Sequence, residues 1–373
     1  MNQKKLGFGF MRLPLINPDD QTSIDYKMLS QMVDTFLERG FTYFDTAYMY
    51  HHFQSEIALR EVLVKRHNRE SFTIATKMPT MFLRKKEDME SIFNEQLEKC
   101  GVEYSDYYML HNLGVSHYEI AKQMDAFDFM QRKKEEGYIK YSGFSFHDTA
   151  EVLDEILTHH PEIDFVQLQI NYLDWDHESI QSRKCYEVAT RHKKAIIVME
   201  PVKGGELANI PKEAEALLKA YHPDLSIPSW AIGFAASLEN VIMVLSGMSN
   251  MDQLLDNTQY MQSFKPFTQE EYKKVETVVD MIHKTITIPC TACQYCVDAC
   301  PKHILIPNYF SLYNKEKQAV GTGLSTQQRL DYNAYIKKYG KASDCIGCKK
   351  CERSCPQHIQ ITKYLEDVAR TFE

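Results

Sequence analysis

Two copies of one cysteine pattern near the C-terminal end of the sequence constrain the fold more than any other feature. Eight of the ten cysteines lie between residues 290 and 355, and each cysteine of the first copy has a counterpart 55 residues later. The copies are Cys290, Cys293, Cys296 and Cys300, then Cys345, Cys348, Cys351 and Cys355. Each ends in Cys-Pro, and the likeness continues through Cys-Pro-Lys-His-Ile and Cys-Pro-Gln-His-Ile. The pattern is therefore an internal repeat of a folded unit.

The spacing CxxCxxCxxxCP is that of bacterial iron–sulfur proteins, in which three cysteines of one run and the fourth of the other hold each [4Fe-4S] cluster. We therefore predict two clusters. Cluster I would be held by Cys290, Cys293, Cys296 and Cys355. Cluster II would be held by Cys345, Cys348, Cys351 and Cys300. The alternatives match less well, because zinc sites commonly use two separated CxxC pairs and disulfide scaffolds belong to secreted chains.

The start of the chain carries no apolar signal-peptide core, so we expect a reducing cytoplasm as the location. Residues 288–362 resemble a bacterial two-cluster ferredoxin domain. The sequence departs from the compact form of that domain, because 44 residues separate Cys300 from Cys345.

The rest of the chain, about 285 residues, has the size of one barrel domain. Apolar residues make up 44% and charged residues 25%, as in ordinary globular proteins. No apolar run reaches about 18 residues, so we expect no membrane span. The formal net charge of −8 and the lack of a basic stripe argue against nucleic-acid binding.

Eight short apolar or β-branched runs alternate with segments of helical spacing, which predicts a closed (β/α)8 barrel of the TIM type, an α/β fold. The runs are 6–10, 41–45, 72–77, 106–111, 140–145, 165–170, 195–200 and 241–246. A doubly wound sheet is disfavoured, because residues 7–12, GFGFMR, break the GxGxxG pattern after the first run. We expect a barrel over 1–265, a linker helix over 266–287, and a small α+β ferredoxin-like domain over 288–373.

Four polar residues stand at the ends of predicted strands, where the loops of such a barrel form one shared face. They are Asp45, Tyr50, Lys77 and His111. In their order and spacing, with the DTAxxY core, residues 5–263 resemble the aldo-keto reductase family. Each residue alone has a structural alternative, such as a helix cap for Asp45. The set of four on one rim favours a catalytic site.

The resemblance implies reduction of a small carbonyl substrate. Hydride transfer to a carbonyl carbon requires a proton donor for its oxygen, and Tyr50 would be that acid. A free tyrosine has a pKa near 10. We expect Lys77, held by Asp45, to lower that pKa, and His111 to orient the carbonyl oxygen.

The resemblance also implies a nicotinamide cofactor, NADPH or NADH, across the barrel mouth. The matching positions are Ser145 and Gln167 for the carboxamide, Met199 for the nicotinamide ring, and Asp256 and Asn257 for the adenosine end. Phe146 replaces the usual carboxamide-binding asparagine, and Met199 stands where a tyrosine often stacks. The segment 246–257 carries no cation for a 2′-phosphate, so the preference for NADPH is only slight.

A hydride carries two electrons and each cluster accepts one, so exchange between them needs a mediator such as a flavin. No flavin-binding motif is readable, but a flavin stays open. We predict an NAD(P)H-dependent carbonyl reductase carrying two clusters for electron transfer or regulation. The alternatives are a ferredoxin-linked electron-transfer protein using a flavin or bound substrate, and a non-catalytic nicotinamide-binding redox sensor. A ferredoxin or another redox protein is a candidate partner.

Overall fold

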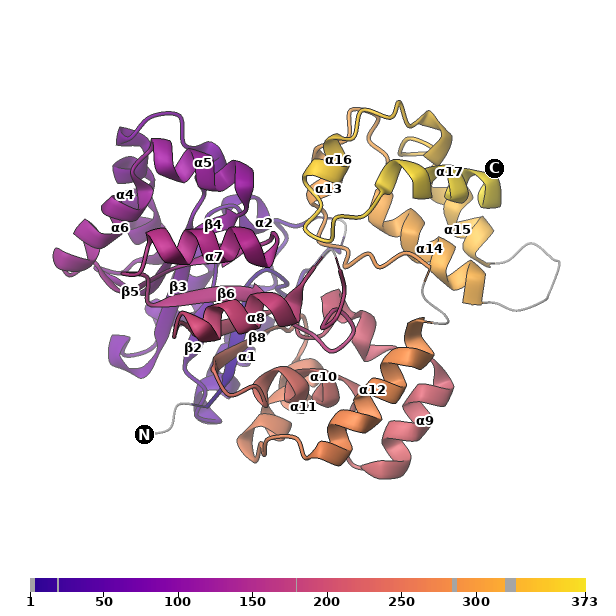
Figure 1. Cartoon of the computed structure of the whole chain (residues 1–373), viewed down its shortest axis with the longest axis horizontal. Coiled ribbons are helices and arrows are strands. Elements are labelled where there is room, and N and C mark those ends of the chain that lie inside the picture. The colour runs from indigo at the N-terminus through magenta and orange to yellow at the C-terminus, as the bar shows by residue number, and fades with distance from the viewer. Residues whose placement is uncertain (1–3, 19, 179, 284–286, 319–326) are drawn as a thin grey trace. The chain divides into compact units, whose positions relative to one another are not determined.

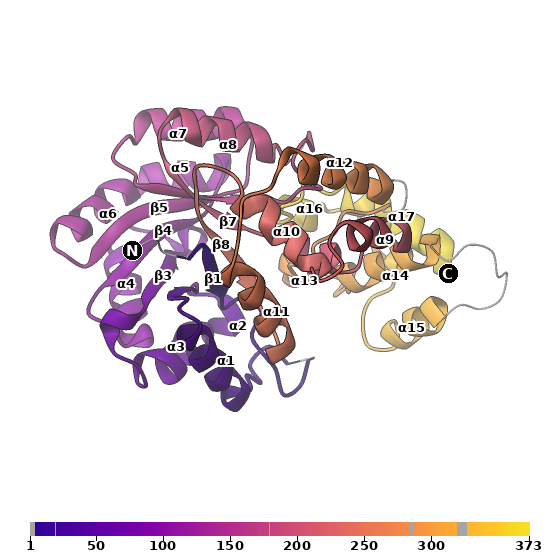
Figure 2. The ribbon, with the colours of Figure 1, turned by 90° about the horizontal axis from the view of Figure 1, so that it is seen from below.

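The computed structural model describes residues 4–18, 20–178, 180–283, 287–318 and 327–373. The chain divides into two compact units (Figures 1 and 2). The first, the barrel unit, comprises Met1–Val202 and Pro228–Thr268. The second, the cluster unit, comprises Lys203–Ile227 and Gln269–Glu373. The cysteine repeat thus shares a unit with a stretch of chain that comes before the last barrel strand.

The barrel unit is a closed barrel of eight parallel strands, each paired with its neighbours in sequence order and the last paired with the first. The strands are β1 (Leu6–Gly9), β2 (Tyr43–Asp45), β3 (Thr73–Met78), β4 (Ser105–Leu113), β5 (Ile139–Phe146), β6 (Phe165–Gln169), β7 (Ala195–Met199) and β8 (Val241–Gly247). Every predicted run overlaps one of these strands. The predicted TIM barrel is confirmed.

Helices surround the ring of strands, as Figure 2 shows. They are α1 (Tyr26–Glu38), α2 (Tyr50–Phe53), α3 (Ser55–Leu59), α4 (Glu87–Cys100), α5 (Val115–Gln123), α6 (Ala126–Glu135), α7 (Ala150–His159), α8 (Ser182–Arg191), α10 (Ile227–Ala236) and α11 (Met251–Gln262). Helix α1 shows how the local sequence favours a helix, with a cap at its start and one apolar face. Asp25 caps its first turn by accepting a hydrogen bond from the Met28 amide, and one face buries Leu29, Met32 and Phe36.

Side chains from six strands fill the barrel interior, which is therefore a packed core and not a pore. This layer consists of Tyr43, Ala75, Met109, Phe165, Ile197, Met243 and Leu245. Gly143 on β5 makes room for it. A Cβ atom there would stand 2.6 Å from the carbonyl oxygen of Phe165, so only glycine allows the two strands to approach this closely.

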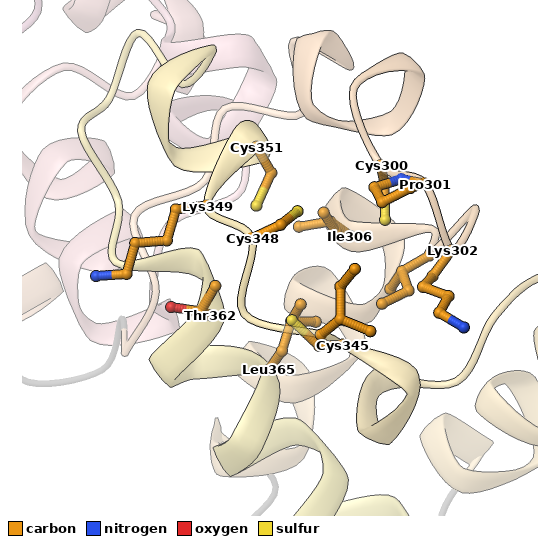
Figure 3. Close-up of a pocket in the computed structure, with 12 residues that line it drawn as sticks. Cys300, Pro301, Lys302, Ile306, Cys345, Cys348, Lys349, Cys351, Thr362 and Leu365 are labelled. Carbon is orange, nitrogen blue, oxygen red and sulfur yellow. The ribbon is translucent and has the colours of Figure 1, made fainter.

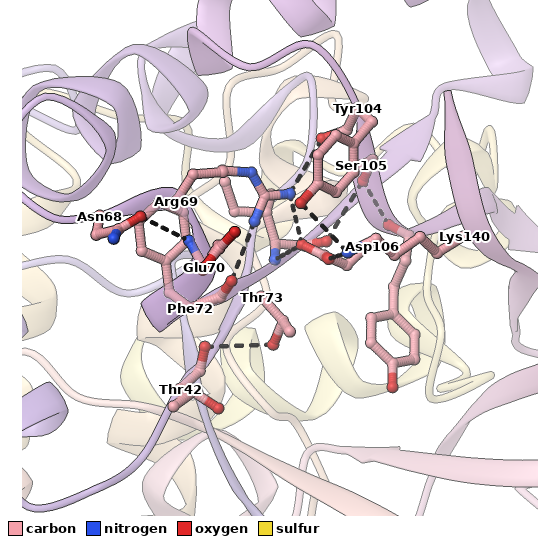
Figure 4. Close-up of polar contacts among 12 residues, drawn as sticks. Thr42, Asn68, Arg69, Glu70, Phe72, Thr73, Tyr104, Ser105, Asp106 and Lys140 are labelled. Atoms are coloured by element: carbon pink, nitrogen blue, oxygen red, sulfur yellow. Dashed lines mark hydrogen bonds and ion pairs between the residues drawn. The ribbon is translucent and has the colours of Figure 1, made fainter. Parts of the chain in front are cut away.

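A buried carboxylate joins three strands near their amino ends (Figure 4). Asp106, the second residue of β4, accepts hydrogen bonds from Arg69 Nη2 at 2.7 Å, Lys140 Nζ at 2.8 Å and the Ile74 amide at 2.9 Å. Polar groups at this end of a parallel barrel serve stability, since catalytic groups collect where the strands finish.

The cluster unit is built from helices. They are α9 (Lys212–Tyr221), α12 (Gln269–His283), α13 (Tyr295–Asp298), α14 (Ile306–Gln318), α15 (Gln327–Tyr335), α16 (Lys350–Arg353) and α17 (Ile361–Phe372). Helix α9 packs against α12, and α14 packs against both α15 and α17. Among the described residues of this unit, β structure is limited to one parallel bridge between Ile304 and Gly340.

The 44 residues that separate the two cysteine runs supply α14 and α15. Of the residues that the structure describes, none belongs to a helix that is both long and apolar enough to cross a membrane.

Candidate active site and cluster sites

A buried ion pair lies at the carboxyl ends of β2 and β3. Lys77 Nζ is 2.5 Å from Asp45 Oδ1, and both side chains are almost fully shielded from solvent. Lys77 also donates to the carbonyl oxygen of Thr46 at 2.7 Å. The second oxygen of Asp45 accepts a hydrogen bond from Gln167 Nε2 at 3.2 Å. Each charge therefore has a partner, which is the condition for keeping it in a barrel core.

Tyr50 and His111 join this pair, so the structure brings together all four predicted catalytic residues. The ammonium of Lys77 is 5.0 Å from the ring centroid of Tyr50. The rings of Tyr50 and His111 meet edge to face with centroids 5.9 Å apart. His111 lies on β4, where its carbonyl oxygen accepts a hydrogen bond from the Thr80 hydroxyl.

The electrostatics of Tyr50 differ from the expectation. Burial raises the pKa of Tyr50 well above 10, and the carboxylates of Asp45 and Glu200 raise it further, while Arg12 acts in the opposite direction. The predicted lowering of the pKa of Tyr50 is not found, because burial is the largest effect and raises it. Tyr50 therefore holds its proton at neutral pH, as a proton donor must, but is a weaker acid than we expected.

His111 is uncharged at neutral pH. Burial lowers the pKa of His111 well below 6.5, and the nearby Lys77 charge lowers it further. Its Nδ1 atom is buried and lacks a hydrogen-bond partner among the described residues. A neutral imidazole can donate one N–H to a carbonyl oxygen, which suits the predicted orienting role.

A left-handed turn follows Tyr50. His51, His52 and Phe53 all have positive φ, between 49° and 69°, in a region that few side chains adopt. His51 is buried and holds this turn. Its Nε2 atom accepts from the Leu13 amide at 3.2 Å, and its Nδ1 lies 2.8 Å from the carbonyl oxygen of Gln21. No local sequence signal announces these two contacts.

Behind Lys77 lies a buried carboxyl group that sequence reasoning missed. Glu56 Oε1 accepts hydrogen bonds from the Thr76 hydroxyl at 2.6 Å and from Gln96 Nε2 at 2.7 Å. The same Gln96 nitrogen is 3.0 Å from the carbonyl oxygen of Lys77. Burial raises the pKa of Glu56 to about 7, so its charge changes within the physiological range.

The residues expected to contact a nicotinamide occupy the ends of β5, β6 and β7 and the helix α11. Ser145 accepts a hydrogen bond from the Asn112 amide at 2.8 Å, and Met199 is the half-buried last residue of β7. Asp256 and Asn257 lie on α11, where Asn257 Nδ2 donates to the Ser246 hydroxyl at 3.0 Å. Their contacts with a cofactor stay a prediction.

The rim has a cation that the sequence did not reveal. The segment 246–257 contains no lysine or arginine, but the Arg12 side chain lies against Gly247, 3.1 to 3.3 Å from the place that a Cβ atom would take. Residue 247 ends β8 and residue 12 follows β1, its neighbour in the barrel. The closure of the barrel brings Arg12 there.

The four cysteines predicted for cluster II line one cavity of about 300 Å³. Cys300, Cys345, Cys348 and Cys351 point toward its middle in Figure 3, so the fourth cysteine of the first run joins three of the second. Ile306 and Leu365 supply apolar walls. A cradle of four thiols with an apolar wall fits a [4Fe-4S] cluster.

The four cysteines predicted for cluster I line a second cavity of about 310 Å³ in the same crossed arrangement. They are Cys290, Cys293, Cys296 and Cys355. Burial raises the pKa of Cys290 to about 12. Since iron binds the thiolate, the charge of the metal must offset this effect of burial. Ile306 lines both cavities and so stands between the two sites.

The repeat extends to the backbone. Left-handed conformations occur at Ala292, Gln294 and His303 in the first copy and at Gly347, Lys349 and His358 in the second. Each pair is 55 residues apart, as the cysteines are. The same turns therefore fold around both cavities.

A buried lysine from outside the repeat lies near cluster I. The side chain of Lys203 is fully buried, and its Nζ donates a hydrogen bond to Gln357 Oε1 at 3.4 Å. Gln357 lines the cluster I cavity. Lys203 is separated from Gln357 by 154 positions, so no sequence pattern could have predicted the contact.

Comparison with known proteins identifies two domains in the chain. The model of the aldo/keto reductase family matches residues 5–280, and that of a 4Fe-4S dicluster domain matches residues 289–361. A curated relative, one component of an ion-translocating oxidoreductase complex from Buchnera aphidicola, is 36% identical over 75 residues, 20% of this chain. The chain spans only 12% of that relative's length.

Solved aldo-keto reductases share the barrel. One from Bacillus halodurans, in its holo form, is 22% identical, covers 74% of this chain and 91% of its own, and has a TM-score of 0.60. One from Klebsiella pneumoniae, in complex with NADP and acetate, is 14% identical, covers 74% and 95%, and also has a TM-score of 0.60. At these identities the likeness concerns the fold. Because the family model spans most of the sequence, including all eight strands and the four residues at their ends, the chain belongs to the aldo/keto reductase family.

Proposed function

We propose that the protein reduces an aldehyde or ketone to an alcohol with a nicotinamide cofactor, and that Tyr50 is the proton donor. The observation that carries the proposal is the buried Lys77–Asp45 pair with Tyr50 and His111 beside it, all on the strand-end face of the barrel. A nicotinamide, when bound, supplies the hydride.

Each residue has a separate task in this reaction. His111, uncharged at neutral pH, donates an N–H to the carbonyl oxygen and orients the substrate. As the carbonyl carbon accepts the hydride, the π electron pair moves to the oxygen and the Tyr50 hydroxyl gives that oxygen its proton. The tyrosinate that remains is stabilised by Lys77, whose position Asp45 fixes.

Replacing Tyr50 by phenylalanine tests this assignment. The variant should keep its fold and its iron content, and lose carbonyl turnover by a factor of at least about 10² to 10⁴, the usual contribution of a positioned acid. Undiminished turnover would show that another group donates the proton. Tight nicotinamide binding by the wild-type chain without turnover of any carbonyl would instead support the redox-sensor alternative.

The cofactor is proposed to be NADPH, with NADH as the competing choice. Two similar structures from Klebsiella pneumoniae are complexes with NADPH or NADP, and the aliphatic part of the Arg12 side chain lies against Gly247 at the end of β8. Dissociation constants for both nucleotides, measured on anaerobically purified protein, test the choice. Equal affinities would remove the preference.

A second function, transfer of single electrons through the clusters, is favoured by the arrangement of the cysteine cavities. One residue, Ile306, lines both cavities, so the two clusters would be neighbours in the fold. A flavin or a bound substrate would then have to convert single electrons into pairs. Identification of a flavin in the purified protein would favour this function over the first.

A further inference from the structure

The two cluster cavities differ in the charge of their surroundings. The cavity of cluster II is lined by Lys302 and Lys349 and by no carboxylate, among the residues that the structure describes. The position that matches Lys302 in the other copy is Gln357, which is uncharged. Charged groups near cluster I are the fully buried Lys203 and the carboxylate of Glu206, and the carboxylate of Glu352 lies near Cys351 of cluster II.

The two lysines beside cluster II are exposed and lie on opposite sides of the cavity in Figure 3. Ile346, which also lines this cavity, is 60% exposed and adds an apolar contact area. An exposed isoleucine that lines the same cavity as two exposed lysines is suited to contact with another protein, since interfaces combine an apolar centre with a polar rim. We call Lys302, Ile346 and Lys349 the cluster II face.

Two carboxylates, Asp344 and Glu352, belong to the segment that carries Lys349, and Asp298 precedes Lys302 by four residues. Asp344 accepts a hydrogen bond from the Lys341 amide at 2.8 Å, and Glu352 Oε1 accepts from the Thr362 hydroxyl at 2.6 Å. Lys349 Nζ is 3.9 Å from the other oxygen of Glu352, and its side chain is 64% exposed. An exposed pair at that distance is weak. Residues 341–353 carry four basic side chains, Lys341, Lys349, Lys350 and Arg353, against the two carboxylates Asp344 and Glu352. This part of the face is therefore positive, although the whole chain has a net charge of −8.

A positive face on an acidic protein selects its partners by charge. Long-range repulsion keeps other acidic proteins away from most of the surface, whereas the lysines attract a negative patch and orient it at the cluster. Cluster I is the next acceptor in the chain, because Ile306 lines both cavities.

We propose that the cluster II face is the docking surface for an acidic one-electron carrier protein, and that cluster II is the first acceptor of its electron. In this step the reduced carrier loses one electron and the oxidised cluster gains it, and no bond or proton is exchanged. The proposal rests on the two clusters and not on the carbonyl chemistry. The Tyr50 test can therefore fail without affecting it.

The experiment mixes anaerobic, oxidised holoprotein with a reduced acidic [2Fe-2S] ferredoxin and follows cluster bleaching by stopped-flow absorbance. For the wild-type protein the second-order rate should fall steeply with added salt. The double variant Lys302→Glu/Lys349→Glu should be slower by about 10- to 100-fold at low ionic strength, with little difference at high salt. Rapid-freeze EPR should show cluster II reduced before cluster I.

Two controls isolate docking from damage to the cluster. Lys315→Glu makes the same change of charge as each substitution of the double variant, at an exposed position of α14 about 13 Å along the helix from Ile306. This variant should react as the wild type does. Reduced methyl viologen, a small cation, should reduce the double variant at least as fast as the wild type.

Three results would overturn the proposal. The first is a wild-type rate that does not depend on salt. The second is a double variant that reacts with ferredoxin as fast as Lys315→Glu. The third is equal slowing with ferredoxin and methyl viologen, which would place the defect in the cluster. If the double variant assembles its clusters poorly, the rate of the Lys302→Gln variant and the salt dependence of the wild-type rate still test the proposal.

Discussion

Removal of Lys77 should destabilise the barrel strongly, because it leaves a carboxylate buried without its cation. Asp45 is 3% exposed, and in a Lys77→Met variant its remaining side-chain partner would be Gln167, at 3.2 Å. Breaking a buried ion pair by removing one partner costs about 3–5 kcal/mol. For a domain of this size each kcal/mol lowers the melting temperature by about 2–4 °C. We therefore expect the melting temperature to fall by roughly 6–20 °C at pH 7.

The pH dependence and a second variant sharpen this prediction. Burial already raises the pKa of Asp45 in the wild type, and in Lys77→Met this folded-state pKa should rise further above the unfolded value of about 3.9, because the ammonium no longer opposes the effect of burial. A raised folded pKa contributes stability that is present below the unfolded pKa and is lost as the pH rises. The deficit relative to wild type should therefore shrink as the pH falls from 7 toward 4.

The double variant Lys77→Met/Asp45→Asn should be more stable than Lys77→Met alone, since the unpaired charge is gone. Anaerobic thermal unfolding followed by circular dichroism measures all three proteins. A loss of unfolding free energy below about 1 kcal/mol for Lys77→Met, or a double variant less stable than the single one, would refute the reasoning.

Four further outcomes are expected. Cys300→Ala should damage cluster II and spare cluster I, so that iron assay gives fewer than about eight irons per chain, whereas EPR showing damage to cluster I would contradict the crossed pairing. Lys203→Met should shift the midpoint potential of cluster I to more negative values in an EPR-monitored titration, because a buried cation favours the reduced cluster; an unchanged potential would exclude that role. The free energy of unfolding of Glu56→Gln should gain up to about 3 kcal/mol on that of the wild type between pH 4.5 and 8. The folded-state pKa of Glu56, about 7, exceeds its unfolded value, so the wild type loses stability as the pH rises through it. A pH-independent difference in melting temperature would argue against a buried titrating carboxyl. Gly143→Ala should cost about 1–3 kcal/mol, because its Cβ would press on the Phe165 carbonyl oxygen, and a variant with wild-type melting temperature would show that the strands can move apart.

The sequence was sufficient for features that depend on local pattern. Each strand of the barrel is a short apolar run with a helix after it, and strand ends share one face in a parallel barrel, so the meeting of Asp45, Lys77 and His111 followed from topology. The cysteine spacing likewise anticipated that Cys300 would stand with the second run and Cys355 with the first.

Features that depend on three-dimensional placement could not be predicted. Arg12 reaches the end of β8 only because the barrel closes, and Lys203 meets Gln357 across 154 residues. The raised pKa of Tyr50 is another case, since it results from the balance between burial and the charges of Asp45 and Glu200. A sequence names these groups but does not give the solvent exposure that decides the balance.

The division of the chain has a practical consequence for anyone wishing to study the barrel without its iron. Helix α9 precedes the last barrel strand in sequence, yet its buried residues Ala214 and Leu218 belong to the unit that contains α12. A protein shortened after residue 268 would keep α9 and lose the helix against which it packs. Such a fragment would expose an apolar stripe and would be prone to aggregate. Alanine or serine replacement of the cysteines in the full-length chain is therefore a safer way to make an iron-free barrel than truncation.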